Sequence, residues 1–175
     1  MRNQEIFHGP LPLINDVIIT PLKIIEVPGG DVLHAMKRSD EGFVEFGEAY
    51  FSMAEPKAIK AWKRHTRMTL NLIVPVGGIR FVIYDDRPES FTQSQFQEVT
   101  LSKQNYCRLT VPPMVWLGFQ GVDESPSMLL NIASILHQPK EADRKDLKEF
   151  KFDWIIQKEK KMMENVQKES MIFGL

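Results

Sequence analysis

The chain has 175 residues, enough to bury one substantial core, and 43% of them are hydrophobic, which excludes a disordered protein. Its formal net charge is −1 at pH 7, so no general basic excess would attract nucleic acid or an anionic membrane surface. The single cysteine, Cys107, cannot form an intrachain disulfide, and no window approaches the roughly 20 apolar residues of a membrane helix. We therefore expect a cytoplasmic protein with no nucleic-acid or membrane partner.

Short apolar runs follow one another from Val17 to about Leu136. They are rich in β-branched and aromatic residues and are separated by Pro, Gly, Asp and Ser, as in β-sandwiches and barrels. The expected strands cover residues 17–19, 22–25, 47–52, 70–76, 79–84, 96–101, 108–111 and 128–132. This pattern predicts an all-β fold with a Greek-key or jelly-roll layout.

The clearest turn lies between residues 72–76 and 79–84. Gly77 and Gly78 can supply the positive φ angles of a two-residue turn, so we predict that these two runs form a β-hairpin. Pro75 has no N–H group to donate to a strand ladder, which predicts that it lies at a sheet edge or at a bulge.

From Lys140 onward the sequence becomes highly charged, with sparse apolar spacing. This change predicts a helical extension over residues 140–175. We assign it to the same domain as the jelly roll of residues 1–139, because no linker or repeat marks a second domain. The apolar residues that would form its packing face, against the barrel or a second subunit, are Trp154, Ile155, Met162, Met163 and Val166. The alternative is a solvated helix.

Several segments coincide in order and spacing with one known family of cupin barrels. The matching segments are residues 20–23, 29–31, 47–52, 60–65, 79–87, 112–119 and 129–131. Over about residues 20–143 the chain resembles the dTDP-4-dehydrorhamnose 3,5-epimerase family. The resemblance implies a cupin double-stranded β-helix, or jelly roll, that usually forms a homodimer. It also implies action on a nucleotide-linked 4-keto sugar with no metal or other cofactor.

Epimerisation beside a ketone needs a base that removes a proton, an acid that returns one to the opposite face, and stabilisation of the enolate. Where the family has its histidine base this chain has Lys63, and the basic residue three positions earlier is Lys60. The family's acid, a tyrosine, meets Leu130. The other departures are Asn71 for a lysine, Leu117 for a histidine and His34 for a glutamate.

Two residues therefore remain candidates for proton transfer. Lys63 could act as a base if burial lowered its pKa, because desolvation disfavours the ammonium form. His65 is the other candidate, and strand alternation would place both side chains on one face. The alternative is that Lys63 is an exposed charge and His65 is hydrogen-bonded at a strand edge.

The residues expected to contact the substrate are Lys60, Glu48, Tyr50, Asn71, Asn131 and His34. Asn131 lies in an apolar run, where an unsatisfied amide would be costly, so it bonds either a ligand or a loop. Trp62 and Trp116 could stack on a ligand, but packing in the core is the simpler interpretation.

Two functions stay open from the sequence. The first is a nucleotide-sugar epimerase or isomerase that abstracts a proton next to the 4-keto group. The second is a non-catalytic cupin that binds a sugar nucleotide or a partner protein after losing the usual acid and base. A metal-dependent cupin is disfavoured, because His65 alone remains of the ligand set that such proteins present.

Overall fold

The computed structural model describes residues 13–155, which form two five-stranded antiparallel sheets packed face to face. The first sheet contains β1 (Ile18–Pro21), β9 (Cys107–Val111), β6 (Leu70–Val76), β11 (Ser127–Ala133) and β4 (Glu48–Ala54), in that spatial order. The second contains β12 (Ala142–Arg144), β5 (Ile59–His65), β10 (Trp116–Gly121), β7 (Gly78–Tyr84) and β8 (Phe96–Ser102). The expected all-β jelly roll is confirmed.

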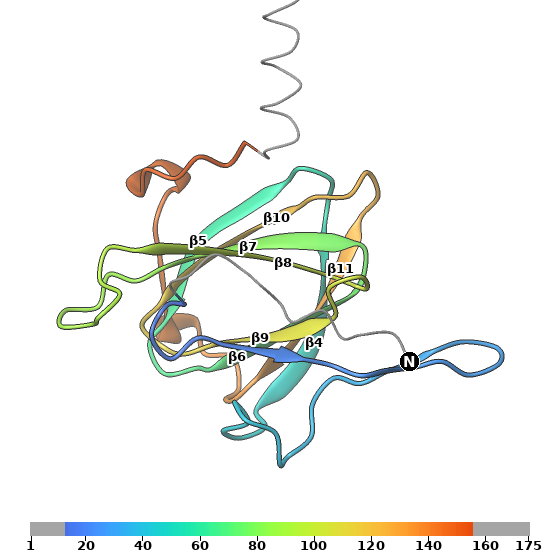
Figure 1. Cartoon of the computed structure of the whole chain (residues 1–175). Coiled ribbons are helices and arrows are strands. Elements are labelled where there is room, and N and C mark those ends of the chain that lie inside the picture. The colour runs from blue at the N-terminus through green and yellow to red at the C-terminus, as the bar shows by residue number, and fades with distance from the viewer. Residues whose placement is uncertain (1–12, 156–175) are drawn as a thin grey trace, which may run out of the picture.

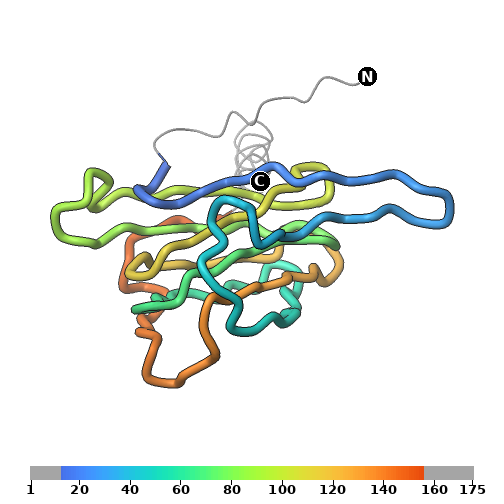
Figure 2. The backbone as a smooth tube through the Cα atoms, turned by 90° about the horizontal axis from the view of Figure 1, so that it is seen from below, coloured from blue at the N-terminus to red at the C-terminus, as the bar shows by residue number. Residues whose placement is uncertain are grey.

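A separate two-stranded ribbon, β2 (Ile24–Ile25) and β3 (Val32–Leu33), projects from this sandwich (Figures 1 and 2). From β4 to β12, consecutive strands lie in different sheets, with one exception. The exception is β7 and β8, which follow each other in the chain and pair as a hairpin in the second sheet. The side chains between the sheets form the main core, whose largest members include Leu72, Ile79, Phe81, Ile83, Leu101 and Leu109.

The predicted hairpin at Gly77 is wrong. β6 pairs with β9 and β11 in the first sheet, whereas β7 pairs with β8 and β10 in the second. Gly77 has a φ of 77°, and a Cβ there would lie 2.3 Å from Ser127 Oγ. The position therefore requires glycine, and the chain passes there from the first sheet to the second. Pro75 lies where the pairing of β6 with β11 shifts register, which confirms the expected bulge.

The helical extension predicted from residue 140 is wrong for residues 140–155. This stretch contains the short 3-10 turns η1 (Pro139–Glu141) and η2 (Leu147–Glu149), and β12, which pairs with β5. Aromatic residues recur at every second position, 150, 152 and 154, a spacing that suits extended chain rather than helix. No helix within residues 13–155 is long and apolar enough to cross a membrane.

We call residues 145–154 the C-terminal strap, because they cover the outer face of the second sheet. Trp154 is buried there, while Ile155 is 42% exposed; the other members of the expected apolar face, Met162, Met163 and Val166, lie outside the described residues. Trp62 and the strap residue Lys145 exchange two backbone hydrogen bonds of 3.1 and 3.2 Å.

An aromatic cluster holds the strap in place. Its members are Trp62, Tyr84, Phe96, Trp116, Phe150, Phe152 and Trp154, packed with Val82. The ring centroid of Trp62 lies 5.3 Å from those of both Phe150 and Trp154. Trp62 and Trp116 are each 1% exposed, so the structural interpretation of these two tryptophans is confirmed.

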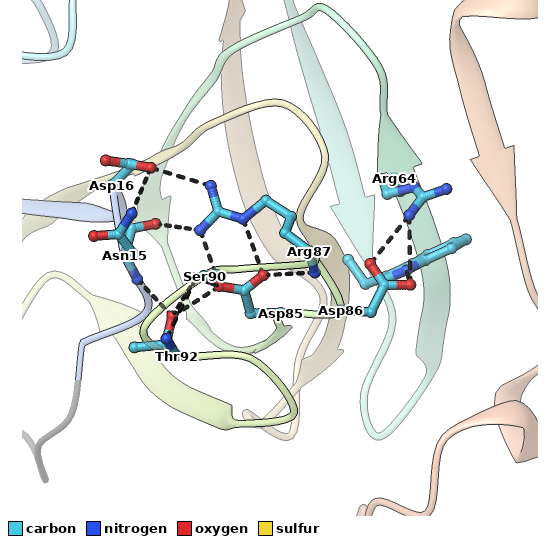
Figure 3. A network of polar contacts seen from close by, with 9 residues as sticks. Asn15, Asp16, Arg64, Asp85, Asp86, Arg87, Ser90 and Thr92 are labelled. Atoms are coloured by element: carbon cyan, nitrogen blue, oxygen red, sulfur yellow. Dashed lines mark hydrogen bonds and ion pairs between the residues drawn. The ribbon is translucent and has the colours of Figure 1, made fainter.

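A buried carboxylate ties the turn after β7 to the start of the described chain (Figure 3). Asp85 is fully buried and accepts hydrogen bonds from Arg87, Ser90 and Thr92 at 2.6 to 2.9 Å. Arg87 also reaches Asp16 at 3.1 Å. Burial favours the neutral acid, but these hydrogen bonds outweigh it, so the pKa of Asp85 lies well below its usual 3.8.

The substitution Asp85→Asn is expected to lower the free energy of unfolding by about 3 kcal/mol at neutral pH, because it breaks a buried ion pair. Because the native pKa is depressed, the carboxylate contributes fully above pH 3.8 and loses its contribution as the pH falls through the native value. Urea denaturation measures the free energy of unfolding of both proteins. The difference between variant and wild type should be smaller well below pH 3.8 than at neutral pH.

Asp16→Asn is the matched control, because Asp16 pairs with the same guanidinium but has a side chain that is 61% exposed. It should cost less than about 1 kcal/mol. Equal losses in the two variants would contradict the buried-pair account.

Candidate active site

A cavity of about 450 Å³ lies between the two sheets. Strands β4, β6 and β11 of the first sheet form one wall, and β5, β10 and β12 of the second sheet form the other. Its polar lining residues are Tyr50, Ser52, Lys60, Lys63, His65, Asn131 and Arg144. Its apolar lining includes Leu70, Leu72, Leu117, Phe119 and Leu129. A hollow that combines apolar walls with converging polar groups is typical of a small-molecule site.

A bulge in β5 brings three ionisable side chains to this cavity. Lys63 pairs with Leu117 of β10, but Lys60 pairs with Phe119, so two residues of β5, 61 and 62, lie opposite the single residue Gly118 of β10. Strict alternation would turn Lys60 and Lys63 to opposite faces, and the irregularity restores both to the cavity side. Lys63 and His65 share that face, as expected for residues two apart in a strand.

His65 is held by a buried glutamate. Its Nδ1 lies 2.5 Å from a carboxylate oxygen of Glu141, and both side chains are buried. The other carboxylate oxygen accepts the backbone N–H groups of Arg67 and Met68 at 2.8 and 2.9 Å. An ionised carboxylate can only accept, so Nδ1 carries the proton and Nε2 carries the lone pair. No residue among 13–155 donates a hydrogen bond to Nε2.

The ionisation of this pair suits a general base. Burial favours the neutral acid, yet the hydrogen bonds from His65, Arg67 and Met68 lower the pKa of Glu141 to about 2. For His65, burial lowers the pKa below its usual 6.5, and the nearby charge of Lys63 lowers it further, against the raising effect of Glu141. At neutral pH the imidazole is therefore neutral and can accept a proton.

Three cations, Lys60, Lys63 and Arg144, line the same cavity as His65. Arg144 pairs in register with Lys63 across β12 and β5. Burial, and then the charge of Arg144, lower the pKa of Lys63 from its usual 10.5. Lys60 donates to the backbone oxygen of Met53 at 2.8 Å and lies 5.7 Å from the ring centroid of Phe119. This concentration of positive charge favours an anionic ligand.

Across the cavity, β4 and β11 supply a hydroxyl and an amide. Tyr50 and Asn131 are register partners, and Asn131 Nδ2 donates to the Tyr50 hydroxyl at 2.7 Å. Asn131 Oδ1 is buried and has no hydrogen-bond partner among the described residues. Asn131 therefore ties down a side chain of the cavity wall rather than a loop.

No family model matches the chain, but individual proteins do. It is 28% identical over 135 residues to a probable low-salt glycan biosynthesis epimerase of Haloferax volcanii, spanning 76% of this chain and 86% of that protein. It is 38% identical to a dTDP sugar isomerase from Desulfovibrio desulfuricans G20, whose crystal structure matches with a TM-score of 0.78 over 81% of this chain and 92% of the other.

The chain belongs to the dTDP-4-dehydrorhamnose 3,5-epimerase family. A spore coat polysaccharide biosynthesis protein of Bacillus subtilis is 28% identical over 109 residues, 62% of this chain and 72% of that protein. An epimerase of the family from Legionella pneumophila, solved with dTDP-4-keto-L-rhamnose, is 18% identical but shares the fold at a TM-score of 0.70, over 78% of this chain and 76% of the other.

The structure shows where the residues that the resemblance singled out lie in this chain. Lys60, Lys63 and Leu117 line the cavity, whereas Leu130 does not. Leu129 and Asn131 face the cavity, and alternation turns Leu130 outward beside Phe51, which is 64% exposed.

Other residues expected at the site lie elsewhere. Asn71 faces away from the cavity, where it donates to the Gly42 carbonyl and accepts from Thr110. His34 borders a separate hollow near β1 and the loop that follows β3. Glu48 is not among the lining residues, although its charge still reaches Lys63.

Two residues of the candidate site lie outside the set expected from the sequence, Glu141 and Arg144. Both come from the stretch that the charge pattern assigned to a helix. Glu141 is 76 positions from His65 in the sequence, so no local motif joins them. The one available signal is a short extended stretch, Ala142 to Arg144, which could have been interpreted as an edge strand.

Proposed function

We propose that this protein is an epimerase or isomerase of a nucleotide-linked 4-keto-6-deoxy sugar and that His65 is its catalytic base. The observation that carries the proposal is the buried Glu141 carboxylate, which fixes the proton on Nδ1 of an imidazole that lines the cavity. A neutral imidazole in this state can remove the proton on the carbon next to the ketone. The solved relatives with dTDP-linked ligands support a nucleotide sugar as substrate.

The surrounding cations fit the charges of such a substrate. Removal of the proton places negative charge on the ketone oxygen, and Lys63, which lines the cavity with His65, is the nearby cation that could stabilise it. Lys60 and Arg144 line the same cavity and would hold the diphosphate, because paired phosphates attract guanidinium and ammonium groups. We also expect, from the family resemblance, a homodimer in the cytoplasm.

A protein that only binds a sugar nucleotide would not need an oriented base. Burial of the Glu141 carboxylate costs free energy, and the His65 hydrogen bond offsets part of that cost while leaving Nε2 available as an acceptor. The relative from Haloferax volcanii is described as a probable epimerase, and the 38% identical structure is that of a dTDP sugar isomerase. Both observations favour catalysis over binding alone.

Deuterium wash-in tests the proposal. The full chain is incubated in heavy water with dTDP-, CDP- and GDP-linked 4-keto-6-deoxy sugars, and NMR follows the hydrogens on carbons 3 and 5. We expect at least one of these hydrogens to exchange with one member of the panel, at a rate well above that with heat-unfolded protein. If no sugar exchanges while titration shows binding, the protein binds a sugar nucleotide without catalysis.

A further inference from the structure

The cavity carries a second group able to move a proton, on the wall that faces His65. Tyr50 lies on β4 of the first sheet, whereas His65 lies on β5 of the second, and both line the same hollow. A bound sugar ring between the sheets would therefore have one of these groups on each side. Inversion at a carbon requires such an arrangement, because the proton must leave from one face and return to the other.

The hydrogen bond to Asn131 sets the direction in which the Tyr50 hydroxyl donates. Asn131 Nδ2 donates to the phenol oxygen at 2.7 Å, so this oxygen is an acceptor in that contact and its own proton remains available. Asn131 is 4% exposed, and its Oδ1 has no partner among residues 13–155, so the amide is a buried polar group facing the hollow. These two side chains are adjacent register partners in the sheet.

The residue that the resemblance places at the position of the family's acid cannot perform this step. Leu130 has no proton to donate, and it projects from the outer face of the first sheet, next to Phe51. The phenol of Tyr50 comes instead from the neighbouring strand, one register position away from Leu130. Of the lining side chains, Tyr50 is the phenol, and Ser52 supplies a more weakly acidic hydroxyl.

We propose that Tyr50 is the general acid of this protein and that Asn131 is the residue that positions it; the inference rests on the proposed function. His65 Nε2 takes the proton from the carbon next to the ketone, and the C–H electron pair forms the enolate. The enolate electrons then take the proton of the Tyr50 hydroxyl on the opposite face, which restores the ketone with inverted configuration. The resulting imidazolium and phenolate return to their starting states by proton exchange with water.

The test separates hydrogen exchange from inversion. The full chain is assayed in heavy water on the sugar that exchanges with wild type, and NMR measures both the wash-in rate and the rate of formation of the epimer. For Tyr50→Phe we expect wash-in within about tenfold of wild type, because His65 can return a deuteron to the face it deprotonated. We expect inversion to fall by about 100-fold or more, the usual contribution of a general acid.

Asn131→Leu should lower inversion by about tenfold, the effect of losing one orienting hydrogen bond, while wash-in stays near the wild-type rate. A general folding defect would lower both rates together, so their ratio reports positioning. The matched control is Phe51→Leu, on the outer face next to Tyr50, which should leave both rates unchanged.

Three results would overturn the assignment in different ways. Inversion by Tyr50→Phe within threefold of wild type would mean that another group is the acid. Equal loss of wash-in and inversion in Tyr50→Phe would assign Tyr50 to substrate binding or enolate stabilisation. Absence of wash-in with wild type would reject the proposed function itself, and the acid with it.

Discussion

His65→Gln is expected to slow deuterium wash-in by about 100-fold to 10,000-fold, the range that general base catalysis usually contributes. Glutamine is the appropriate replacement because its side-chain amide can still donate to the Glu141 carboxylate, so the buried acceptor is not left unpaired. Circular dichroism checks that the variant folds, and NMR in heavy water measures the rate. Wild-type exchange should also decline toward low pH with a midpoint below 6.5, because only the neutral imidazole accepts a proton.

Lys63→Gln is the matched variant, because Lys63 faces the same cavity two residues earlier. If Lys63 stabilises the enolate, the exchange rate at neutral pH should fall. The midpoint of the low-pH decline should move upward, because the charge of Lys63 helps to lower the pKa of His65. Loss of exchange in Lys63→Gln together with normal exchange in His65→Gln would instead assign the base to Lys63.

Trp154→Ala is expected to lower the free energy of unfolding by about 3 to 5 kcal/mol, the usual cost of removing a buried tryptophan. Trp154 is 8% exposed and packs against Trp62 and Phe152, with centroid distances of 5.3 and 5.0 Å. Its loss should detach the C-terminal strap from the second sheet. Urea denaturation followed by tryptophan fluorescence measures the change.

The control for this substitution is Ile155→Ala. Ile155 is the next residue but is 42% exposed, so the expected change is about 0.5 kcal/mol or less. A small effect of Trp154→Ala, similar to that of the control, would show that the strap contributes little to stability.

The barrel could be predicted from the sequence because its strands bury one or both faces and so alternate or run apolar along their length. β6, β7, β8, β9 and β11 follow the predicted runs closely for this reason, whereas β5 and β10 were not among the predicted strands. Pairing could not be predicted with the same success. Gly77 has the chemistry of a hairpin turn, and the choice between pairing β6 with β7 and sending them to different sheets depends on partners remote in the sequence.

In the site, too, the features set by local alternation could be predicted, and those set by long-range contacts could not. Lys63 and His65 could be placed on one face by simple alternation, and Lys60 joined them only through the bulge in β5. Asn71 illustrates the opposite case, because alternation along β6 turns it away from Leu70 and Leu72, which line the cavity. Glu141 could not be predicted, because its contact with His65 depends on the docking of the last described segment.

The last segment to be synthesised among the described residues, β12 and the strap, completes the candidate site. A chain ending at residue 139 would contain every strand of the sandwich except β12, yet it would lack both Glu141 and Arg144. Because synthesis proceeds from the N-terminus, β11 leaves the ribosome before Glu141 does, so the other strands of the sandwich can pair before Glu141 docks beside His65. At that stage His65 would lack the Glu141 carboxylate that sets its tautomer. We therefore expect activity to appear only after β12 and the strap have docked on β5.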